Sequence, residues 1–388
     1  MANKKRVLIL GAGFAGLTIA HRLRENIPDK ANVIVISESD RVYDNTIFPA
    51  LLTDDVKIEN TYFLASQKLP PRGIEFIESK VLEIRPESNE VKTDKGTFDY
   101  DYLVVALGGA YEENFNKIKG HENAFMHHTL EGFLGIKKVV EEKDEINAFV
   151  GNAMNSPIEG PSYQVAFILE YLGRKLGKRV TVYLGTQSPK GMFGILPVDW
   201  IPKQVNAYAE KRGIKLIKGV YVKEISRNKV LLSNGNEIDT NLISVLPTLS
   251  APEIAKKAGL TDESGFISVE HPTFRSTKFR NIFAVGDSAK GMIPAKTGRA
   301  AMISSENAAA TIVKELSGRT LPYYAQGVIC MMHAGDYSGM LIFDVNKYVK
   351  KIDFRWGSMY KYLKKLYSAM LISSAFSVPY HMALPYYN

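Results

Sequence analysis

A glycine-rich turn directly after an apolar N-terminal run constrains this chain more than any other feature. Arg6–Leu10 is a short apolar run, typical of a parallel strand that is buried on both faces. It leads into Gly11-Ala12-Gly13-Phe14-Ala15-Gly16 and then into a helical pattern that continues to about Arg24. Another strand pattern follows at Val33–Ile36. This order of strand, turn, helix and strand predicts a Rossmann-type dinucleotide-binding domain.

The three glycines of the turn have separate expected roles. Gly11 permits the tight turn, Gly13 lets the backbone approach a pyrophosphate, and Gly16 lets the helix pack closely on the strand. Phe14 and Ala15 begin the helix, whose free N–H groups and partial positive charge attract an anion. The alternative is a glycine-rich turn without a ligand, but the context of strand and helix favours dinucleotide binding.

An acidic residue is expected about 20 residues after such a turn, where it binds ribose hydroxyls. Glu38 is the best candidate, although Ser37 occupies the position where the acid is most expected. The alternative for Glu38 is a solvated carboxylate at the end of a strand.

Two later segments follow the pattern of flavoprotein motifs. Phe98–Gly108 predicts a buried strand that ends in a turn of small residues, and Asn281–Asp287 predicts another strand before a helix over residues 298–316. Three motifs in this order resemble the FAD-binding flavoproteins. The resemblance implies FAD as cofactor, with Asp287 holding a ribityl hydroxyl. It also implies FAD contacts for Ala106, Gly108 and Gly286. The alternative for Asp287 is a helix N-cap, which Asp also favours.

The chain is predicted to be an α/β protein with two three-layer Rossmann-like domains, the second inserted in the first. A second strand–helix–strand pattern runs through residues 148–150, 161–176 and 179–184. We therefore expect an FAD-binding domain at 1–110 and 241–320, and a second Rossmann-like domain at 111–240. A C-terminal membrane and quinone segment is expected at 321–388.

Two further segments narrow the resemblance. Phe48-Pro49-Ala50-Leu51 and Ile293-Pro294-Ala295-Lys296-Thr297-Gly298 resemble sulfide:quinone oxidoreductases and the related single-subunit NADH:quinone oxidoreductases. The resemblance implies that Pro49 lies beside the isoalloxazine and that Lys296 points at its pyrimidine edge. A cation there would stabilise the anionic reduced flavin. The alternative for Lys296 is an ordinary surface lysine.

The turn of the second domain bears on the electron donor. An NADH-binding relative would have a second GxGxxG here, but the chain has Gly151-Asn152-Ala153-Met154-Asn155-Ser156-Pro157-Ile158-Glu159-Gly160-Pro161. The next strand ends at Gly185, where a ribose would require an acid. Both features predict a domain that is degenerate for NADH. Glu159-Gly160-Pro161 instead resembles the sulfide:quinone branch.

The chain has a single cysteine, Cys330, so it forms no internal disulfide or cysteine-cluster metal site, and no metal is expected. The resemblance places Cys330 in a loop, Gly327–Cys330, that carries one of the family's paired redox cysteines. Ile158 and, by a looser alignment, His128 stand where its partners would be, and Gln164 replaces a carboxylate. Cys330 is expected to be a redox nucleophile, supported by positive potential from His333 and Lys296, and His128 a catalytic base. The alternatives are an inert buried thiol and an ordinary histidine.

The tail has the pattern of an amphipathic helix. Eight apolar residues recur at helical spacing: Trp356, Met359, Tyr360, Leu363, Leu366, Tyr367, Met370 and Leu371. Lys361, Lys364 and Lys365 are expected elsewhere on the helix. With the aromatic end at 378–387, this pattern predicts an interfacial membrane anchor. The alternative is a helix that packs its apolar face on the protein or on a partner chain.

The net charge of +8 fits an anionic ligand or surface, but the basic residues form no nucleic-acid motif, and no nucleic acid is expected. No apolar run is long enough to span a membrane, and the N-terminus lacks the pattern of a secretory signal. We expect a cytoplasmic protein that is peripheral on the inner face of the cell membrane; a homo-oligomer is left open.

The expected function is an FAD-dependent oxidoreductase, similar to sulfide:quinone oxidoreductases, that passes two electrons from a small sulfur species through flavin to a quinone. An NADH:quinone oxidoreductase and a non-catalytic flavin-binding partner or sensor are the alternatives.

Overall fold

The computed structural model describes residues 4–291, 295–345, 350–377 and 386–387. A seven-stranded sheet forms the first domain, in the order β17-β18-β19-β9-β1-β2-β5. Its parallel strands are β1 (Lys5–Leu10), β2 (Ala31–Ser37), β5 (Glu75–Glu78), β9 (Tyr102–Val105) and β19 (Ile282–Ala284). The antiparallel edge consists of β17 (Val269–Glu270) and β18 (Arg275–Ser276).

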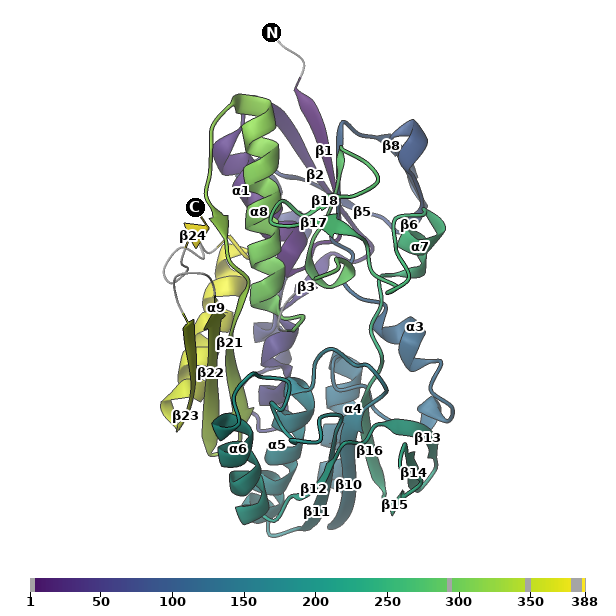
Figure 1. Cartoon of the computed structure of the whole chain (residues 1–388), viewed down its shortest axis with the longest axis vertical. Coiled ribbons are helices and arrows are strands. Elements are labelled where there is room, and N and C mark those ends of the chain that lie inside the picture. Colours follow the sequence, from purple (N-terminus) through teal and green to yellow (C-terminus); the bar gives the residue numbers. More distant parts are fainter. Residues whose placement is uncertain (1–3, 292–294, 346–349, 378–385, 388) are drawn as a thin grey trace.

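Helices α1 (Phe14–Asn26) and α8 (Gly298–Ser317) pack on each other and cover this sheet (Figure 1). Val7, Leu8, Ile9 and Leu10 are each 0% exposed, because β1 lies between β2 and β9 and is covered on both faces. Burial on both faces explains why the sequence reads as a continuous apolar run, without alternation of polar and apolar residues.

The second domain contains a parallel four-stranded sheet in the order β12-β11-β10-β16. Its strands are β10 (Glu145–Asn152), β11 (Arg179–Thr186), β12 (Lys215–Lys218) and β16 (Leu242–Leu246). Its helices are α4 (Leu130–Glu142), α5 (Gly160–Leu176) and α6 (Trp200–Lys211). Because β16 pairs with β10, this sheet extends past the boundary that the sequence predicted at residue 240.

Smaller elements join and flank the domains. Two three-stranded antiparallel sheets consist of β6 (Val81–Arg85), β7 (Glu90–Thr93) and β8 (Gly96–Asp99), and of β13 (Val222–Ser226), β14 (Lys229–Leu232) and β15 (Glu237–Asp239). β3 (Arg41–Tyr43) pairs with β4 (Tyr62–Leu64). The short helices are α2 (Ala65–Lys68), α3 (Tyr111–Phe115) and α7 (Glu253–Lys257), and a 3₁₀ helix, η1, spans Asn45–Leu51.

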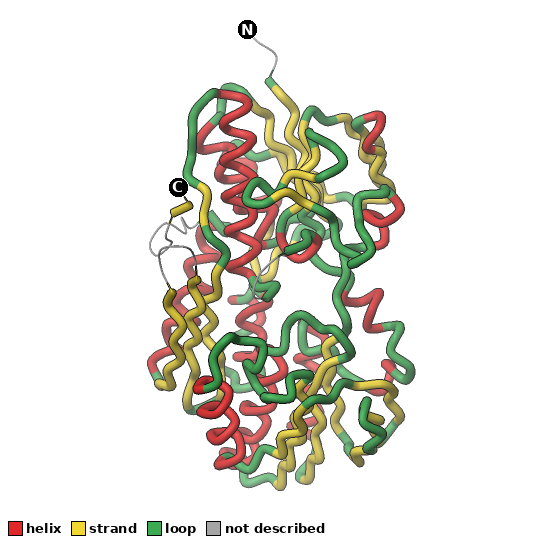
Figure 2. The backbone as a smooth tube through the Cα atoms, viewed as in Figure 1, coloured by secondary structure: helices red, strands yellow, loops and turns green. Residues whose placement is uncertain are grey.

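The C-terminal segment lies along both domains (Figures 1 and 2). Strands β21 (Gly327–Ala334), β22 (Tyr337–Val345) and β23 (Lys350–Gly357) form an antiparallel sheet, followed by α9 (Met359–Ser374). β20 (Tyr323–Tyr324) pairs with β24 (Tyr386–Tyr387). Strand β21 packs on α5 and α8, and α9 packs on η1.

Two expectations about this segment were wrong. Gly327–Cys330 is part of strand β21 and not a loop, and Trp356 belongs to β23 and not to the amphipathic helix. The other predicted strands and helices of the two domains are present, with ends that differ by a few residues. The predicted α/β class with two Rossmann-type domains is confirmed. Residues 293–294 and most of 378–387 lie outside the described residues.

Candidate functional site

A cavity of about 890 Å³ is bordered by both domains and by the C-terminal segment. The first domain contributes the glycine turn, the turn after β9, Gly286-Asp287 and the start of α8. The second domain contributes residues 156–161 and part of the segment after β11, and the C-terminal segment contributes Cys330, Lys364 and Tyr367. Segments that are far apart in the sequence therefore form one wall.

The glycine turn has the geometry that a pyrophosphate requires. Gly11 has a φ of +104°, and a Cβ on Gly16 would collide with the carbonyl oxygen of Gly11. A Cβ on Gly13 would meet no protein atom within 4 Å. Gly13 borders the cavity, so its missing side chain leaves room there for a ligand and does not serve packing in the core. Phe14 and Ala15 border the cavity at the start of α1, which has no side-chain cap. The first N–H groups of α1 are thus available to an anion.

Asp287 borders the cavity in the 3₁₀ turn at Gly286–Ser288. The hydroxyl of Tyr111 donates a hydrogen bond to its Oδ2 at 3.0 Å. Burial raises the pKa of Asp287, while the charge of Lys296 and the bond from Tyr111 oppose this shift. Asp287 is not the cap of α8; Thr297 has that role, accepting from Ala300 N at 3.1 Å.

Lys296 is 5% exposed, so the interpretation as a surface lysine is wrong. Its Nζ donates to the carbonyl oxygen of Ala289 at 2.6 Å and lies 4.0 Å from the ring centroid of Phe266. Burial lowers the pKa of Lys296 to about 8, against the attraction of Asp287. The side chain borders the cavity, as do Pro49, Ala106 and Gly108.

Glu38 is not part of the cavity wall. It follows the end of β2, its side chain is 68% exposed, and its Oε2 lies 3.9 Å from Nζ of Lys80. Its expected contact with a ribose stays a prediction.

His128 borders the cavity and stacks on Tyr111, with ring centroids 3.8 Å apart and planes inclined by 18°. Nδ2 of Asn45 donates to its Nε2 at 3.1 Å. Burial lowers the pKa of His128 to about 4, so the imidazole is neutral near pH 7. To act as a base, Nε2 of His128 would have to give up its hydrogen bond with Asn45 and accept a proton instead.

Cys330 also borders the cavity. Burial raises the pKa of its thiol, and only the positive charge of Lys364 opposes this shift. His333 does not supply the expected positive potential. Its Nδ1 accepts from Gly335 N at 3.0 Å, its Nε2 donates to Asp55 at 3.1 Å, and burial lowers its pKa. This pattern of one acceptor and one donor is that of a neutral imidazole.

In the turn of the second domain, the carboxylate of Glu159 is held by hydrogen bonds within that domain. Oε1 of Glu159 accepts from Gln187 N at 2.7 Å, and Oε2 accepts from the hydroxyl of Tyr163 at 2.5 Å. Burial raises the pKa of Glu159. A second pyrophosphate at the start of α5 would meet this carboxylate.

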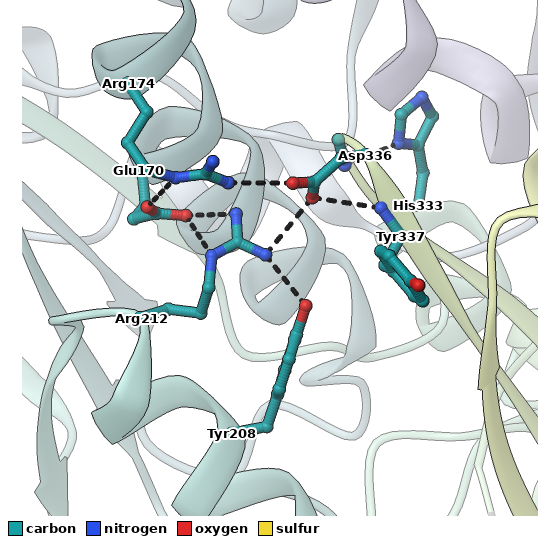
Figure 3. A network of polar contacts seen from close by, with 8 residues as sticks. Glu170, Arg174, Tyr208, Arg212, His333, Asp336 and Tyr337 are labelled. Atoms are coloured by element: carbon teal, nitrogen blue, oxygen red, sulfur yellow. Dashed lines mark hydrogen bonds and ion pairs between the residues drawn. The ribbon is translucent and has the colours of Figure 1, made fainter.

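A polar network holds the turn between β21 and β22 on the second domain (Figure 3). Asp336 accepts from Arg174 at 2.9 Å and from Arg212 at 3.2 Å. Both arginines also donate to the carboxylate of Glu170, each through its Nε at 2.6 Å. Arg212 donates as well to the hydroxyl of Tyr208 at 2.9 Å. This network fixes one end of the strand that carries Cys330.

Helix α9 has one exposed face and one face that packs on the protein. Four residues of the predicted apolar face are exposed, at 62%, 40%, 59% and 44%: Met359, Leu363, Leu366 and Met370. Lys364, Ser368 and Leu371 are buried. Lys364 thus lies elsewhere on the helix than the exposed apolar residues, as expected, but its side chain is buried. Among the described residues, no helix is both long and apolar enough to cross a membrane.

Sequence reasoning missed Tyr111, Lys364 and the network around Asp336 as parts of this site. Lys364 lies three residues before Tyr367 and seven before Leu371, a spacing that places it on the buried face of the helix. The pair Gly335-Asp336 between two apolar runs is a signal for a hairpin.

The fold and this cavity define an FAD-binding oxidoreductase with two dinucleotide-type domains. A family model described as pyridine nucleotide-disulphide oxidoreductase matches residues 5–304, and the chain belongs to this family. It is an FAD-dependent enzyme that is similar to sulfide:quinone oxidoreductases.

Four comparisons illustrate the likeness. Sulfide-quinone reductase of Aquifex aeolicus is 28% identical over 364 residues, 88% of this chain and 84% of that protein. The structure of the Aquifex aeolicus sulfide:quinone oxidoreductase superposes with a TM-score of 0.86 at 25% identity, covering 97% of this chain and 93% of that one. The mitochondrial sulfide:quinone oxidoreductase of Mus musculus is 26% identical over 74% of this chain, but the match spans only 66% of that protein. A type II NADH:quinone oxidoreductase of Staphylococcus epidermidis is 25% identical over 87% of this chain and 90% of that protein.

Proposed function

We propose that this flavoprotein transfers two electrons from a small sulfur donor, through FAD, to a quinone. The single observation that carries the proposal is one cavity that joins the glycine turn and Lys296 to the only cysteine of the chain. FAD, when bound, accepts the electron pair from the donor and delivers it to the acceptor.

The residues of the cavity divide the work of holding and using FAD. The turn Gly11–Gly16 holds the pyrophosphate, and Asp287 holds the ribityl chain. Lys296 supplies positive charge beside the flavin, where negative charge develops on reduction. Cys330 would carry the donor sulfur as a persulfide, formed from its thiol and sulfide while FAD takes up the two electrons and the protons that are released. Because the chain has no second cysteine, sulfur bound to Cys330 must leave to an acceptor from solution.

The membrane surface is the proposed place of quinone reduction. Met359, Leu363, Leu366 and Met370 form an exposed apolar stripe along α9, and an adjacent face of the helix borders the cavity at Lys364 and Tyr367. A helix that lies in the interface with this stripe in the lipid would place the cavity next to the quinone pool. That this surface is the inner face of the cell membrane stays a prediction.

NADH:quinone oxidoreduction is the second candidate, because relatives with this activity match most of the chain. The bonds of Glu159 to Gln187 and Tyr163, and the absence of an acidic residue at Gly185, count against it.

Anaerobic bleaching of the bound flavin tests these donors. We expect sulfide to bleach the flavin absorbance and an added quinone to restore it, while NADH at micromolar concentration bleaches it slowly or not at all. Rapid, saturable bleaching by NADH would favour the second candidate. A flavin that neither reagent reduces would indicate a non-catalytic flavin-binding protein.

A further inference from the structure

The turn that ends helix α9 packs on the start of helix α1. The rings of Phe376 and Phe14 meet edge to face, with their centroids 4.6 Å apart and their planes inclined by 73°. Phe14 follows Gly13 in the glycine turn and borders the cavity. The ring of Phe376 that contacts it is buried, and the residue is 1% exposed. A residue of the C-terminal segment therefore contacts the turn assigned to the FAD pyrophosphate.

Two further contacts hold the end of α9 on the first domain. Nε2 of His21, on α1, donates to the carbonyl oxygen of Ala375 at 2.9 Å. The ring centroid of Phe376 also lies 5.7 Å from that of Phe63 in β4. Ala375 and Phe376 have φ values of +54° and +62°, a left-handed conformation that costs free energy in residues with a side chain. Such a conformation persists where the surrounding contacts hold it, as they do here.

Phe14 also contacts helix α8. A Cβ on Gly298, the first residue of α8, would lie 3.1 Å from the Phe14 ring, so this ring packs directly on the backbone there. Oγ of Ser305, further along α8, donates to the carbonyl oxygen of Ala15 at 2.8 Å. The starts of α1 and α8 both border the cavity. Phe14 thus joins the two helix starts to the end of α9, and Phe376 is the contribution of the C-terminal segment.

We propose that Phe376 is a positioning residue for FAD, which holds Phe14, and with it the first N–H groups of α1, where they bind the pyrophosphate. The turn depends on support from outside, because Gly11 and Gly13 have no side chains that could fix its backbone.

The inference rests on the proposed role of the glycine turn and extends the FAD site to the C-terminal segment. Helix α9 then has a second task. Its exposed apolar stripe is proposed to meet the membrane, and its end retains the cofactor. Loss of the Phe376 ring should therefore weaken FAD binding without any change in the residues that border the cavity.

Titration of the full-length apoprotein with FAD tests the proposal, with quenching of flavin fluorescence as the measure of Kd. Phe376→Ala removes the ring, and Phe376→Leu keeps much of its volume in case the first variant does not fold. Phe167→Ala is the matched control. Phe167 is 0% exposed, contacts Tyr208 and Trp356 in the second domain and C-terminal sheet, and does not border the cavity. Urea unfolding of each apoprotein, followed by circular dichroism, measures stability separately.

We expect Phe376→Ala to raise the Kd for FAD about tenfold, equal to ~1.4 kcal/mol. Phe376→Leu should raise it by a smaller factor, since leucine keeps apolar contact but loses the ring pair. Phe167→Ala should lower the urea midpoint and leave the Kd unchanged.

The route through Phe14 is tested by Phe14→Leu, alone and combined with Phe376→Ala. Because Phe376 acts through the ring of Phe14, its removal should change the Kd little further once Phe14 is replaced. A merely structural role of Phe376 would give the same fold-change in Kd in both backgrounds.

A Kd of the Phe376 variants equal to that of the wild type would overturn the proposal. So would an equal rise in Phe167→Ala, or the same fold-change with and without the Phe14 substitution. These outcomes are separate from the fate of the proposed function. Sulfide that bleaches flavin while the Kd values stay equal contradicts only the role of Phe376, and Kd values that change as expected without bleaching contradict only the sulfur donor.

Discussion

Gly13 and Gly16 belong to the same turn, but the structure gives them different tasks. A side chain at Gly16 would collide with the carbonyl oxygen of Gly11, whereas a side chain at Gly13 would enter the cavity without touching the protein. Gly16 therefore serves the packing of α1 on the sheet, and Gly13 serves the ligand.

We predict that Gly13→Val abolishes FAD binding but not folding, because valine fills the space of the pyrophosphate and strains no backbone at a φ of −89°. Gly16→Val should instead destabilise the domain. Flavin absorbance after reconstitution and the melting of the apoprotein by circular dichroism measure the two effects. Stoichiometric FAD on the Gly13 variant would contradict the assignment of the turn.

Lys296 allows a prediction about the flavin potential. Its positive charge should stabilise the anionic reduced flavin, so Lys296→Met is expected to lower the midpoint potential at pH 7 by about 30 mV, or ~1.4 kcal/mol for two electrons. Because the lysine, with a pKa of about 8, loses its charge at higher pH, the difference from wild type should shrink above that pH. Spectroelectrochemistry at several pH values measures it. Identical potentials at pH 7 would place the ammonium group too far from the flavin to act.

The sequence predicted the residues of the cavity whose roles depend on local patterns. The glycine turn, Asp287 and Lys296 stand in motifs that follow strands, and a strand end determines where such residues lie. Lys364 and Tyr111 could not be found in this way, because their roles arise from contacts with Gln164 and Asp287 across the fold. The same limit explains Glu38, whose orientation after β2 is not fixed by the motif.

At the scale of elements, strand β21 is the feature that the sequence described wrongly. Gly327–Ala334 contains Met331, Met332 and His333 without clear alternation, so the strand was not visible in its own pattern, and only Gly335-Asp336 after it indicated pairing with β22. Its position depends on Asp336 at one end and on the bond between His333 and Asp55 near that end. The strand that carries Cys330 is thus tied to both domains.

In the network that holds the turn between β21 and β22, Glu170 is the residue whose loss should lower the free energy of unfolding most. Its side chain is 10% exposed and binds Arg174 and Arg212, so Glu170→Gln leaves buried positive charge and should destabilise the protein by ~3 kcal/mol. The matched control is Glu145→Gln, since the pair of Glu145 with Arg179 is 60% and 81% exposed and contributes little. Urea unfolding followed by circular dichroism compares the midpoints. Equal midpoints for both variants would mean that the network does not secure the hairpin.

At the scale of the whole molecule, the C-terminal segment closes a cavity that neither domain could form alone. The sequence showed that α9 is amphipathic, but it did not show which apolar residues are exposed and which face the cavity or the core. Tyr367 and Leu371 were counted with the apolar face, yet Tyr367 borders the cavity and Leu371 is 0% exposed. Deleting the helix would open the cavity as well as remove an anchor, so substitutions on the exposed stripe are the sharper test.

We predict that Leu363→Glu with Leu366→Glu releases the protein from anionic liposomes while FAD stays bound. Each exposed leucine contributes ~1.5–3 kcal/mol when it enters an apolar phase, so losing two should weaken binding by more than about tenfold. Leu82→Glu with Leu176→Glu is the matched control, because it replaces two leucines that are each 49% exposed elsewhere and changes the net charge equally. Sedimentation with liposomes measures the bound fraction, and flavin absorbance confirms the cofactor. High salt should weaken attachment of the wild type, since it screens the attraction between lysines and lipids. If both double variants sediment like the wild type, the stripe does not enter the membrane, and the quinone must reach the cavity from another side.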